Sequence, residues 1–510
     1  LCGNVLTRYF RALPQAEAYA LLLEERAPGK KALRAFPRVR RQNPRRPDSG
    51  TAQRCPSAGA FPCEAQVMAG GGMTYAVDAR GRGFLSARAL ALTCRVPDPF
   101  LQQGPQVYLA AQGAPESIGA YGSPWFARGR AVYTLERGGL RAEMTCFVSP
   151  LDGAAMQLVE ARNTSAEDAE IALCSFLDVC IAPQEEFEGH PAFQRLLIET
   201  AAPRENLLLA RRRTRHDGES FPLVCHACFA GGEAAFSYET DRAAFLRRGE
   251  ITLPSGCGRT GAVIDPCLSV CARLKIPAQG ARRVWFLTAA VEDEAQALRL
   301  AARYETAEAA AQALALSEVS ADVTARGAGL NESAELAAQR MAAHLICPSP
   351  RPGTKPAARE ELWRFSISGD LPLMTVLLRD ERHAALARQA VRAHAYLTRL
   401  GLRFDLALVN LQSEGYFQPL RDALLSLLAS CASRDTIGRP GGVTLVDAGL
   451  YPPHAVEALL SLSALELDGN GGSAARQLAL MESRWPAPET LGRRLSALRP
   501  AHGTPALDNG

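Results

Sequence analysis

The sequence has few aromatic residues and no long hydrophobic run. Phe, Trp and Tyr together make up 6% of the 510 residues, so any aromatic platform for a sugar ring or a base has to be built from few side chains. No stretch approaches the roughly 18 consecutive apolar residues that a membrane-spanning helix needs. Residues 1–10 lack the charged start, apolar stretch and cleavage site of a signal peptide. We therefore expect a soluble segment without membrane contact.

An excess of charge of one sign is also missing. The chain carries 57 Lys and Arg residues against 53 Asp and Glu residues, which gives a formal net charge of +4 at pH 7. So small an excess argues against nucleic acid as a partner. The 14 cysteines are scattered and lack the dense, regular spacing of a small secreted scaffold. They indicate reduced thiols and a cytoplasmic location.

The densest group of metal-ligand residues is Cys225-His226-Ala227-Cys228. In a β-strand, residues three apart point to opposite faces, and no second Cys/His pair follows at zinc-finger spacing. Cys267 and Cys271 share one face of a predicted strand, but they lie too far apart for a direct disulfide. The sequence therefore favours buried thiols over a metal site. It also lacks the glycine-rich motifs of nucleotide cofactors, and we expect no cofactor.

Acidic residues gather near Pro183, and they are candidates for the acid/base pair of a glycosidase. They are Asp178, Glu185, Glu186 and Glu188. Such a pair needs two carboxylates that face each other across a cleft, which sequence cannot establish. A solvated loop is the favoured interpretation of this region, and no catalytic residue is predicted.

The pattern of apolar residues predicts the fold class. Between residues 68 and 291 many segments alternate apolar and polar side chains with a period of two, as in 141–147 and 268–276. So many strands without intervening helices predict a large antiparallel sandwich. Helical patterns follow at 292–323 and 333–346. After a Pro-rich break at 348–356, strands and helices alternate, which predicts a small parallel α/β module.

We thus expect a β-rich multidomain chain, in which the α/β module has strands at 373–378, 404–411 and 442–446 and a helix at 453–467. The expected segments are a short helical region at 1–26, a Pro- and Arg-rich linker at 27–67, the sandwich at 68–291, linker helices at 292–356, the α/β module at 357–468 and a segment of poor periodicity at 469–510.

The α/β module offers a candidate binding site. In open parallel sheets ligands bind beyond the carboxyl ends of the strands. This rule places five polar residues around one crevice as candidate substrate-binding residues: Arg379, Asp380, Asn410, Gln412 and Asp447. A helix-start role explains Asp380 equally well.

Several strings occur together and in a fixed order. They are VSP at 148–150, HPAF at 190–193, ETDR at 239–242, LWRFSISGDLP at 362–372, RAHAY at 392–396 and the strand at 405–410. Together they resemble the middle of cyclic β-1,2-glucan synthases and of related oligoglucan phosphorylases in glycoside hydrolase family 94. The chain departs from the family where Ser366 replaces the usual glycine.

The resemblance implies a galactose-mutarotase-like β-supersandwich that binds carbohydrate. It also implies that residues 1–26 end a glycoamylase-like region and that 469–510 lead into a catalytic (α/α)6 barrel absent from the sequence. The chain would then be a non-catalytic portion of a β-1,2-glucan-processing glycosyltransferase or phosphorylase, with a β-glucan oligosaccharide or polysaccharide as partner. Inorganic phosphate would act only in a complete phosphorylase, and a complete synthase would be anchored to the inner membrane. The alternative is a stand-alone carbohydrate-binding or scaffolding protein.

The string at 362–372 is expected to act as a structural anchor. Its key residues are Trp363, Ser368, Gly369 and Asp370. We expect Trp363 to be buried, Gly369 to adopt a backbone angle that other residues resist, and Asp370 to accept backbone N–H groups. A buried tryptophan of this kind would make Trp363→Ala cost about 3–5 kcal/mol of stability.

Overall fold

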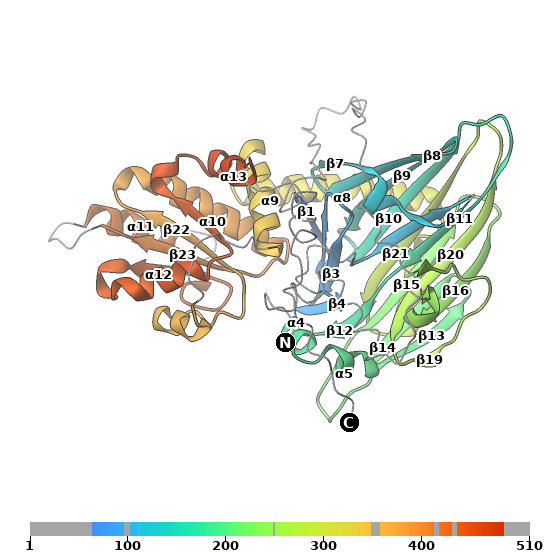
Figure 1. The fold of residues 1–510 in the computed structure, drawn as a ribbon, viewed down its shortest axis with the longest axis horizontal. Coiled ribbons are helices and arrows are strands. Elements are labelled where there is room, and N and C mark those ends of the chain that lie inside the picture. The colour runs from blue at the N-terminus through green and yellow to red at the C-terminus, as the bar shows by residue number, and fades with distance from the viewer. Residues whose placement is uncertain are drawn as a thin grey trace, which may run out of the picture.

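The computed structural model describes residues 64–95, 103–111, 113–247, 250–347, 357–412, 418–430 and 436–483. The region expected at 1–26, most of the linker expected at 27–67 and the chain from residue 484 onward lie outside the described residues. Within the described part, a large sheet-rich body and a smaller α/β module lie side by side (Figure 1). The predicted fold class, a β-rich chain with large antiparallel sheets, is confirmed.

Three antiparallel sheets build the sandwich. The first contains, in spatial order, β1 (Ala65–Gly70), β2 (Met73–Asp78), β3 (Gly83–Ala87), β4 (Leu90–Thr93) and β12 (Val179–Ala182). The second contains β19 (Gly261–Ala262), β13 (Ile198–Arg204), β14 (Leu207–Arg212), β15 (Leu223–Ala230), β21 (Ala281–Val291), β10 (Ala154–Asn163), β9 (Leu140–Ser149), β8 (Arg130–Arg137) and β7 (Ser123–Ala127). The third contains β16 (Ala235–Asp241), β20 (Pro266–Ile276), β11 (Ala169–Phe176), β5 (Gln106–Ala110) and β6 (Glu116–Ser117).

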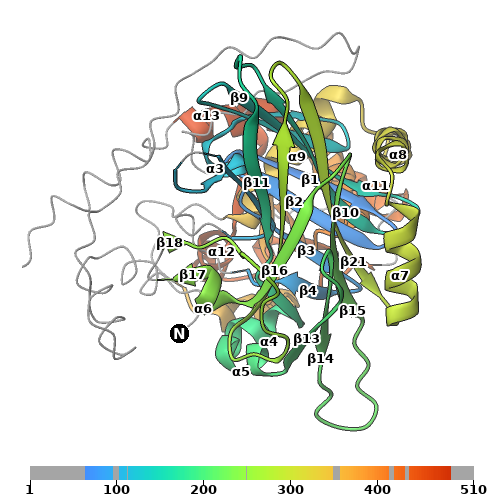
Figure 2. The same ribbon diagram turned by 90° about the vertical axis from the view of Figure 1, so that its right-hand side faces the viewer.

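Short elements decorate the ends of these sheets. They are α3 (Ile118–Tyr121), α4 (Gln184–Gly189), α5 (Pro191–Leu196), α6 (Arg242–Phe245) and the pair β17 (Leu246–Arg247) and β18 (Glu250–Ile251). Figure 2 shows α4 and α5 together at one end of the sandwich, below β4 and beside β13 and β14. Strands β3 and β4 form a hairpin. Its turn residues Arg88 and Ala89 both have positive φ without the Gly or Asn that usually marks such a turn.

The long helical pattern after the sandwich forms three helices. They are α7 (Glu294–Arg303), α8 (Ala307–Gly327) and α9 (Glu332–Ile346). Helix α8 starts anew after α7. Thr306 is its N-cap, since its hydroxyl accepts the Ala309 N–H. Helix α7 and the first half of α8 cover the outer face of the nine-stranded sheet, where Trp285, Leu209 and Leu300 share one buried cluster.

The α/β module contains a fully parallel sheet in the order β24 (Val443–Asp447), β23 (Asp405–Asn410), β22 (Leu373–Leu378) and β25 (Leu465–Asp468). The first three strands were predicted. The fourth was not, because residues 453–467 were expected to form one helix, whereas α12 (Pro453–Ser461) ends early and β25 follows. Leu465 and Leu467 are buried and alternate with Glu466 and Asp468. A strand of four residues offers too short an alternation to distinguish from the end of a helix.

The other helices of the module cover both faces of this sheet. They are the 3₁₀ turns η1 (Arg359–Phe365), η2 (Glu381–His383), η4 (Ala448–Leu450) and η5 (Gly469–Gly471), and the helices α10 (Ala384–Arg399), α11 (Pro419–Ser430) and α13 (Ala474–Ser483). Helices α10, α11 and α13 lie on one face and α12 on the other (Figure 1). Within the described residues, no helix has the length and apolar composition needed to cross a membrane.

The sheet β1–β4 is buried on both faces and joins the sandwich to the α/β module. Alternate side chains point to opposite sides, so Met68, Tyr75 and Leu85 enter the sandwich core. Their neighbours Val67, Ala76 and Phe84 pack instead against α9 and α10. The two parts therefore share one strand layer.

Polar contacts fix this joint. The Gln339 side chain on α9 accepts the N–H of Val67 at 2.8 Å and donates to its carbonyl at 3.0 Å. Thr74 Oγ1 donates to the carbonyl of Leu400 at 2.8 Å. Beyond it, Gly401 ends α10 with φ +82°, and a Cβ atom at this position would overlap Thr74 Oγ1. This close approach explains why glycine stands at the end of α10.

We expect Gln339→Ala to lower the free energy of unfolding by about 1–3 kcal/mol, because both backbone groups of Val67 would lose their buried partner. Urea denaturation measures this change. Gln312→Ala, at an exposed position of α8, is the matched control and should stay within about 0.5 kcal/mol of the wild type. Equal effects of the two changes would contradict the role of Gln339.

Candidate functional site

The five candidate residues of the α/β module lie at one edge of its sheet. Strand pairing aligns Leu378 with Asn410 and Asn410 with Asp447. Arg379 and Asp380 follow β22 directly, and Gln412 follows β23 by two residues. The structure thus brings the set to the carboxyl edge, as the parallel order requires.

The first of two polar clusters at this edge spans β22 and β25. Arg379 pairs with Asp468 through both guanidinium nitrogens, with Nη2 2.9 Å from Oδ2. The Arg379 N–H donates to His383 Nδ1 at 3.0 Å. The chain leaves β22 toward β23 on one side and returns to β25 on the other, so this pair sits at the switch point of the sheet. The sequence did not identify Asp468 and His383 as candidate site residues. Asp468 was missed because the segment that forms β25 was expected to be helical.

Asp380 acts as a cap in this cluster. Its carboxylate accepts the Arg382 N–H at 2.9 Å and starts η2. The Arg382 guanidinium also binds it, with Nη2 2.8 Å from Oδ2, and this hydrogen bond lowers the pKa of Asp380. Asp380 therefore has the helix-start role that the sequence offered as an alternative.

The second cluster spans β23 and β24. Asn410 Nδ2 donates to Asp447 Oδ1 at 2.9 Å, and Arg421 Nε on α11 donates to Asp447 Oδ2 at 3.0 Å. The Gln412 N–H donates to Asn410 Oδ1 at 3.0 Å, which orients the Asn410 amide. Among the described residues, the buried Gln412 Oε1 has no hydrogen-bond partner. This cluster therefore carries a free acceptor beside an amide and a carboxylate.

The structural anchor at 362–372 differs from its prediction. Trp363 is 63% exposed, so the expectation of a buried tryptophan was wrong. A 3₁₀ turn repeats every three residues, which puts Leu362 and Phe365 on the buried face and Trp363 off it. Gly369 has φ +76°, as expected. Asp370 pairs with Arg359 rather than capping backbone groups.

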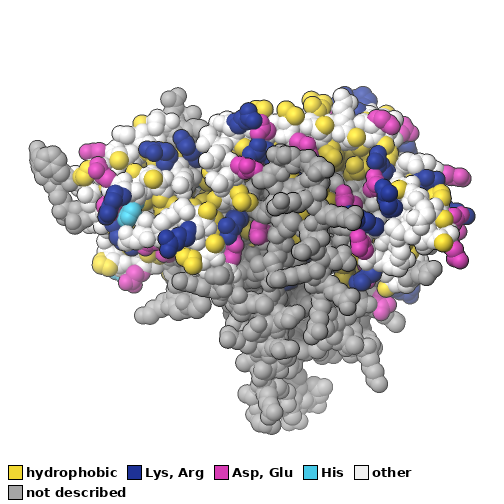
Figure 3. Space-filling view, turned by 90° about the horizontal axis from the view of Figure 1, so that it is seen from above, with side chains coloured by type: hydrophobic (Ala, Val, Ile, Leu, Met, Phe, Trp, Pro, Cys, Tyr) yellow, Lys and Arg dark blue, Asp and Glu magenta, His cyan; other side chains and the backbone are white. Residues whose placement is uncertain are grey.

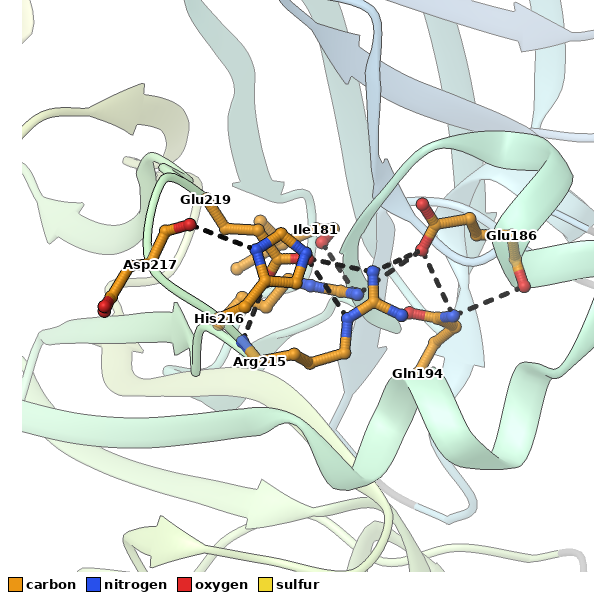
Figure 4. Close-up of polar contacts among 8 residues, drawn as sticks. Ile181, Glu186, Gln194, Arg215, His216, Asp217 and Glu219 are labelled. Atoms are coloured by element: carbon orange, nitrogen blue, oxygen red, sulfur yellow. Dashed lines mark hydrogen bonds and ion pairs between the residues drawn. The ribbon is translucent and has the colours of Figure 1, made fainter.

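One of the acidic residues near Pro183, Glu186, belongs to an ion-pair cluster at the end of the sandwich (Figure 4). The expectation of a solvated loop was wrong here, because 184–189 form helix α4, whose first turn places Glu185 and Glu186 at the positive end of the helix dipole. Glu186 Oε2 lies 3.6 Å from Arg212 Nη2 and 3.5 Å from Arg215 Nη2. Arg215 also binds Glu219 through its N–H at 2.8 Å.

Arg212 is the buried centre of this cluster. Its side chain is fully buried, and Nη1 donates to the carbonyl of Ile181 at 3.2 Å. Burial lowers the pKa of Arg212. Ile181 holds φ +66°, a costly conformation for a β-branched residue, and so aims its carbonyl at the guanidinium. The backbone hydrogen bond from Arg215 lowers the pKa of Glu219. This shift is opposite to the one a general acid needs, so the cluster suits a structural latch.

The remaining acid, Asp178, belongs to a second network. Arg195 on α5 binds Asp178 through Nη1 at 2.9 Å and Nη2 at 3.1 Å, and Arg195 also pairs with Asp265. Arg242 Nη1 donates to Asp265 Oδ2 at 3.1 Å. The two carboxylates are thus occupied by two guanidiniums, and they tie α5 to the third sheet.

The Cys-His-Ala-Cys string has its members on opposite faces of β15, as predicted. Cys225 packs toward helix α7, whereas Cys228 enters the sandwich core. His226 lies between Ser175 Oγ at 2.7 Å and Thr288 Oγ1 at 2.9 Å, and burial lowers its pKa to about 4. In the described part of the chain no group of three or more His, Cys, Asp or Glu side chains is arranged to hold a metal ion. Absence of bound metal stays a prediction.

Surface charge is mixed rather than of one sign. On the face shown in Figure 3, basic and acidic side chains are interspersed over the described residues. Most of the basic groups discussed above have acidic partners. Over the described residues of this face, the mixed charges fit the small net charge of the chain.

Three comparisons with known proteins bear on this site. Residues 63–307 match the family model described as glycosyl hydrolase 94, supersandwich domain. The chain is 25% identical over 511 residues to cyclic beta-(1,2)-glucan synthase NdvB of Rhizobium meliloti (strain 1021), and this match covers 93% of the chain and 18% of that relative. The chain thus spans less than a fifth of the length of the relative.

Two solved structures are similar to part of the chain at low identity and low TM-score. A bacterial glucoamylase complexed with acarbose is 8% identical with a TM-score of 0.33, covering 61% of this chain and 44% of that chain. A putative aldose 1-epimerase from Escherichia coli K12 is 8% identical with a TM-score of 0.27, covering 44% of this chain and 100% of that chain.

We expect Arg212→Ala to lower the free energy of unfolding by about 2–3 kcal/mol, because the buried Ile181 carbonyl would lose its charged donor and Glu186 would keep only Arg215. The neighbouring Arg211→Ala is the matched control. Arg211 lies on the same strand with a side chain 68% exposed, and the loss of its surface ion pair should cost about 0–1 kcal/mol. Chemical denaturation of both variants measures the two changes. An Arg212→Ala variant as stable as the wild type would refute the structural role of Arg212.

Proposed function

We propose, on the premise that residues 63–307 form a glycosyl hydrolase 94 supersandwich domain, that this chain is the non-catalytic, carbohydrate-binding part of a β-1,2-glucan-processing enzyme. The observation that carries the proposal is the extent of the likeness to the glucan synthase. The similarity covers 93% of the chain, and so it includes the α/β module as well as the sandwich.

The proposed division of labour follows the segments expected from the sequence. The supersandwich at 68–291, the linker helices at 292–356 and the α/β module at 357–468 act as one support for a catalytic domain elsewhere in the complete enzyme. In that enzyme, inorganic phosphate is a co-substrate only if the reaction is phosphorolysis. The chain works on the cytoplasmic side. If the complete enzyme is a synthase, other segments of it supply the membrane anchor.

The state of the carboxylates supports a non-catalytic role. A glycosidic general acid needs a raised pKa, commonly in an apolar pocket. The acids of the candidate sites lie instead against guanidinium groups: Asp468 against Arg379, Asp447 against Arg421. Burial of Asp468 opposes its ionisation, but the hydrogen bonds that it accepts, first of all from Arg379, and the nearby cations together outweigh this effect and lower the pKa of Asp468. Asp468 therefore suits hydrogen bonding to sugar hydroxyls better than proton donation.

The carboxyl edge of the parallel sheet is the proposed glucan contact. Asn410, Asp447 and Gln412 present amide and carboxylate groups there, and Gln412 Oε1 has no partner among the described residues. The oxygen is buried, so a sugar hydroxyl would reach it only after the Gln412 side chain turns outward, and the new hydrogen bond would then satisfy it. Arg379 and Asp380 would border the same crevice.

We expect the full chain to bind linear β-1,2-glucan in isothermal titration calorimetry. Gln412→Ala should weaken this binding about 2–10-fold, the equivalent of one hydrogen bond. Gln312→Ala, at an exposed position of α8, should leave the affinity unchanged. With glucan and phosphate the chain should release no glucose 1-phosphate. Release above background would contradict the non-catalytic role, and equal affinities of both variants would remove the carboxyl edge as the contact.

A further inference from the structure

An exposed tryptophan stands on the surface of the α/β module. Trp363 in η1 is 63% exposed, whereas the buried Trp285 is 1% exposed. Exposing so large an aromatic surface to water is unfavourable, because it forgoes the free energy that burial would yield. Single exposed apolar side chains are common, so the contacts around Trp363 have to show whether it can bind a ligand.

The ring is held in place rather than free to rotate. Trp363 Nε1 donates to the carbonyl of Ser368 at 3.3 Å. Arg359 Nε approaches the same carbonyl at 3.4 Å, and the Arg359 guanidinium pairs with Asp370. One edge of the indole is therefore tethered to the turn, while most of its surface remains in solvent.

The turn that supplies this carbonyl uses a costly backbone conformation. Ser366 has φ +59°, which few residues other than glycine adopt readily. Gly369 has φ +76°, and a Cβ atom there would lie 2.8 Å from Arg359 Cγ. Ser366 is the left-handed C-cap that ends η1, and glycine adopts a positive φ without strain. The two residues thus turn the chain back against η1 and place the Ser368 carbonyl beside the indole.

The platform also has a rigid base. Leu362 and Phe365 on the other face of η1 are 3% and 2% exposed. They pack with Ala455 of α12, and the Phe365 ring contacts the Tyr451 ring at a tilt of 46° with centroids 4.5 Å apart. Tyr451 lies in the connection from β24 to α12, which begins at the carboxyl edge of the sheet. The base therefore links the tryptophan to the edge that carries Asp447.

The surroundings of the ring are charged. The side chains of Arg359, Asp370 and Arg364 are 52%, 48% and 51% exposed, and Glu361 pairs with Arg364 at 3.0 Å. The core of a protein interface is depleted of charged residues. A pyranose ring, in contrast, combines an apolar C–H face with a rim of hydroxyl groups. A single aromatic face ringed by charged donors and acceptors matches that chemistry.

We propose that Trp363 is a sugar-binding platform, on which a glucosyl unit of a β-linked glucan stacks against the indole face. Its hydroxyl groups hydrogen-bond to the exposed Arg359 and Asp370 side chains. The proposal rests on the glucan-binding function proposed above and adds a second contact to the carboxyl edge. A ring that is already held by the Ser368 carbonyl loses little conformational entropy on binding.

The test is a titration of the full chain with linear β-1,2-glucan, followed by calorimetry and by tryptophan fluorescence. Trp363→Ala should weaken binding about tenfold and remove the fluorescence change that glucan causes in the wild type. Trp363→Phe, which keeps a smaller aromatic face, should bind with intermediate affinity. Leu151→Ala, at a side chain 69% exposed on the sandwich, is the control and should bind like the wild type. The thermal midpoint of Trp363→Ala should stay within about 2 °C, because the ring is not buried.

The outcomes separate this inference from the function on which it rests. Equal glucan affinity of Trp363→Ala and wild type, with Gln412→Ala still weakened, would overturn the platform and leave the proposed function standing. Loss of binding together with a fall of the thermal midpoint by more than about 5 °C would make the residue structural and overturn the platform too. A wild-type chain that binds no glucan would overturn both proposals.

Discussion

The structure depends on one strand layer that is buried from both sides. Strands β1–β3 send Met68, Tyr75 and Leu85 into the sandwich and Val67, Ala76 and Phe84 toward α9 and α10. A strand with both faces buried cannot shift its register by one residue without exchanging the two sets. The position of the α/β module is therefore coupled to the core of the sandwich.

Helix α9 holds this layer through a chain of polar contacts. Arg128, between β7 and β8, donates to Glu335 at 2.7 Å, and Tyr396 on α10 donates to the same carboxylate at 3.1 Å. Gln339, one turn further along α9, donates to Tyr396 at 3.1 Å and to the backbone of Val67. Because a buried network of this kind is satisfied only in one arrangement, it fixes where the candidate glucan contacts lie relative to the sandwich.

Periodicity predicted much of this architecture and little of the site. The alternation in residues 268–276 and the apolar run of residues 373–378 correspond to β20 and β22. The pairing of Arg379 with Asp468 depended on β25, a strand too short to recognise. The exposure of Trp363 depended on a 3₁₀ turn. The pattern of apolar residues does not distinguish the three-residue period of such a turn from the period of an α-helix. Ion pairs between distant segments, such as Arg212 with Glu186, leave no local signal in the sequence.

The central claim is that the sandwich and the α/β module form one cooperative unit. Differential scanning calorimetry of the full chain tests it most directly, since weakly joined domains unfold in separate steps. The account predicts one transition in the wild type, with equal calorimetric and van't Hoff enthalpies. In Gln339→Ala the transition should remain a single peak and its midpoint should fall. Two resolved transitions in the wild type, or a change confined to one of them in the variant, would contradict it.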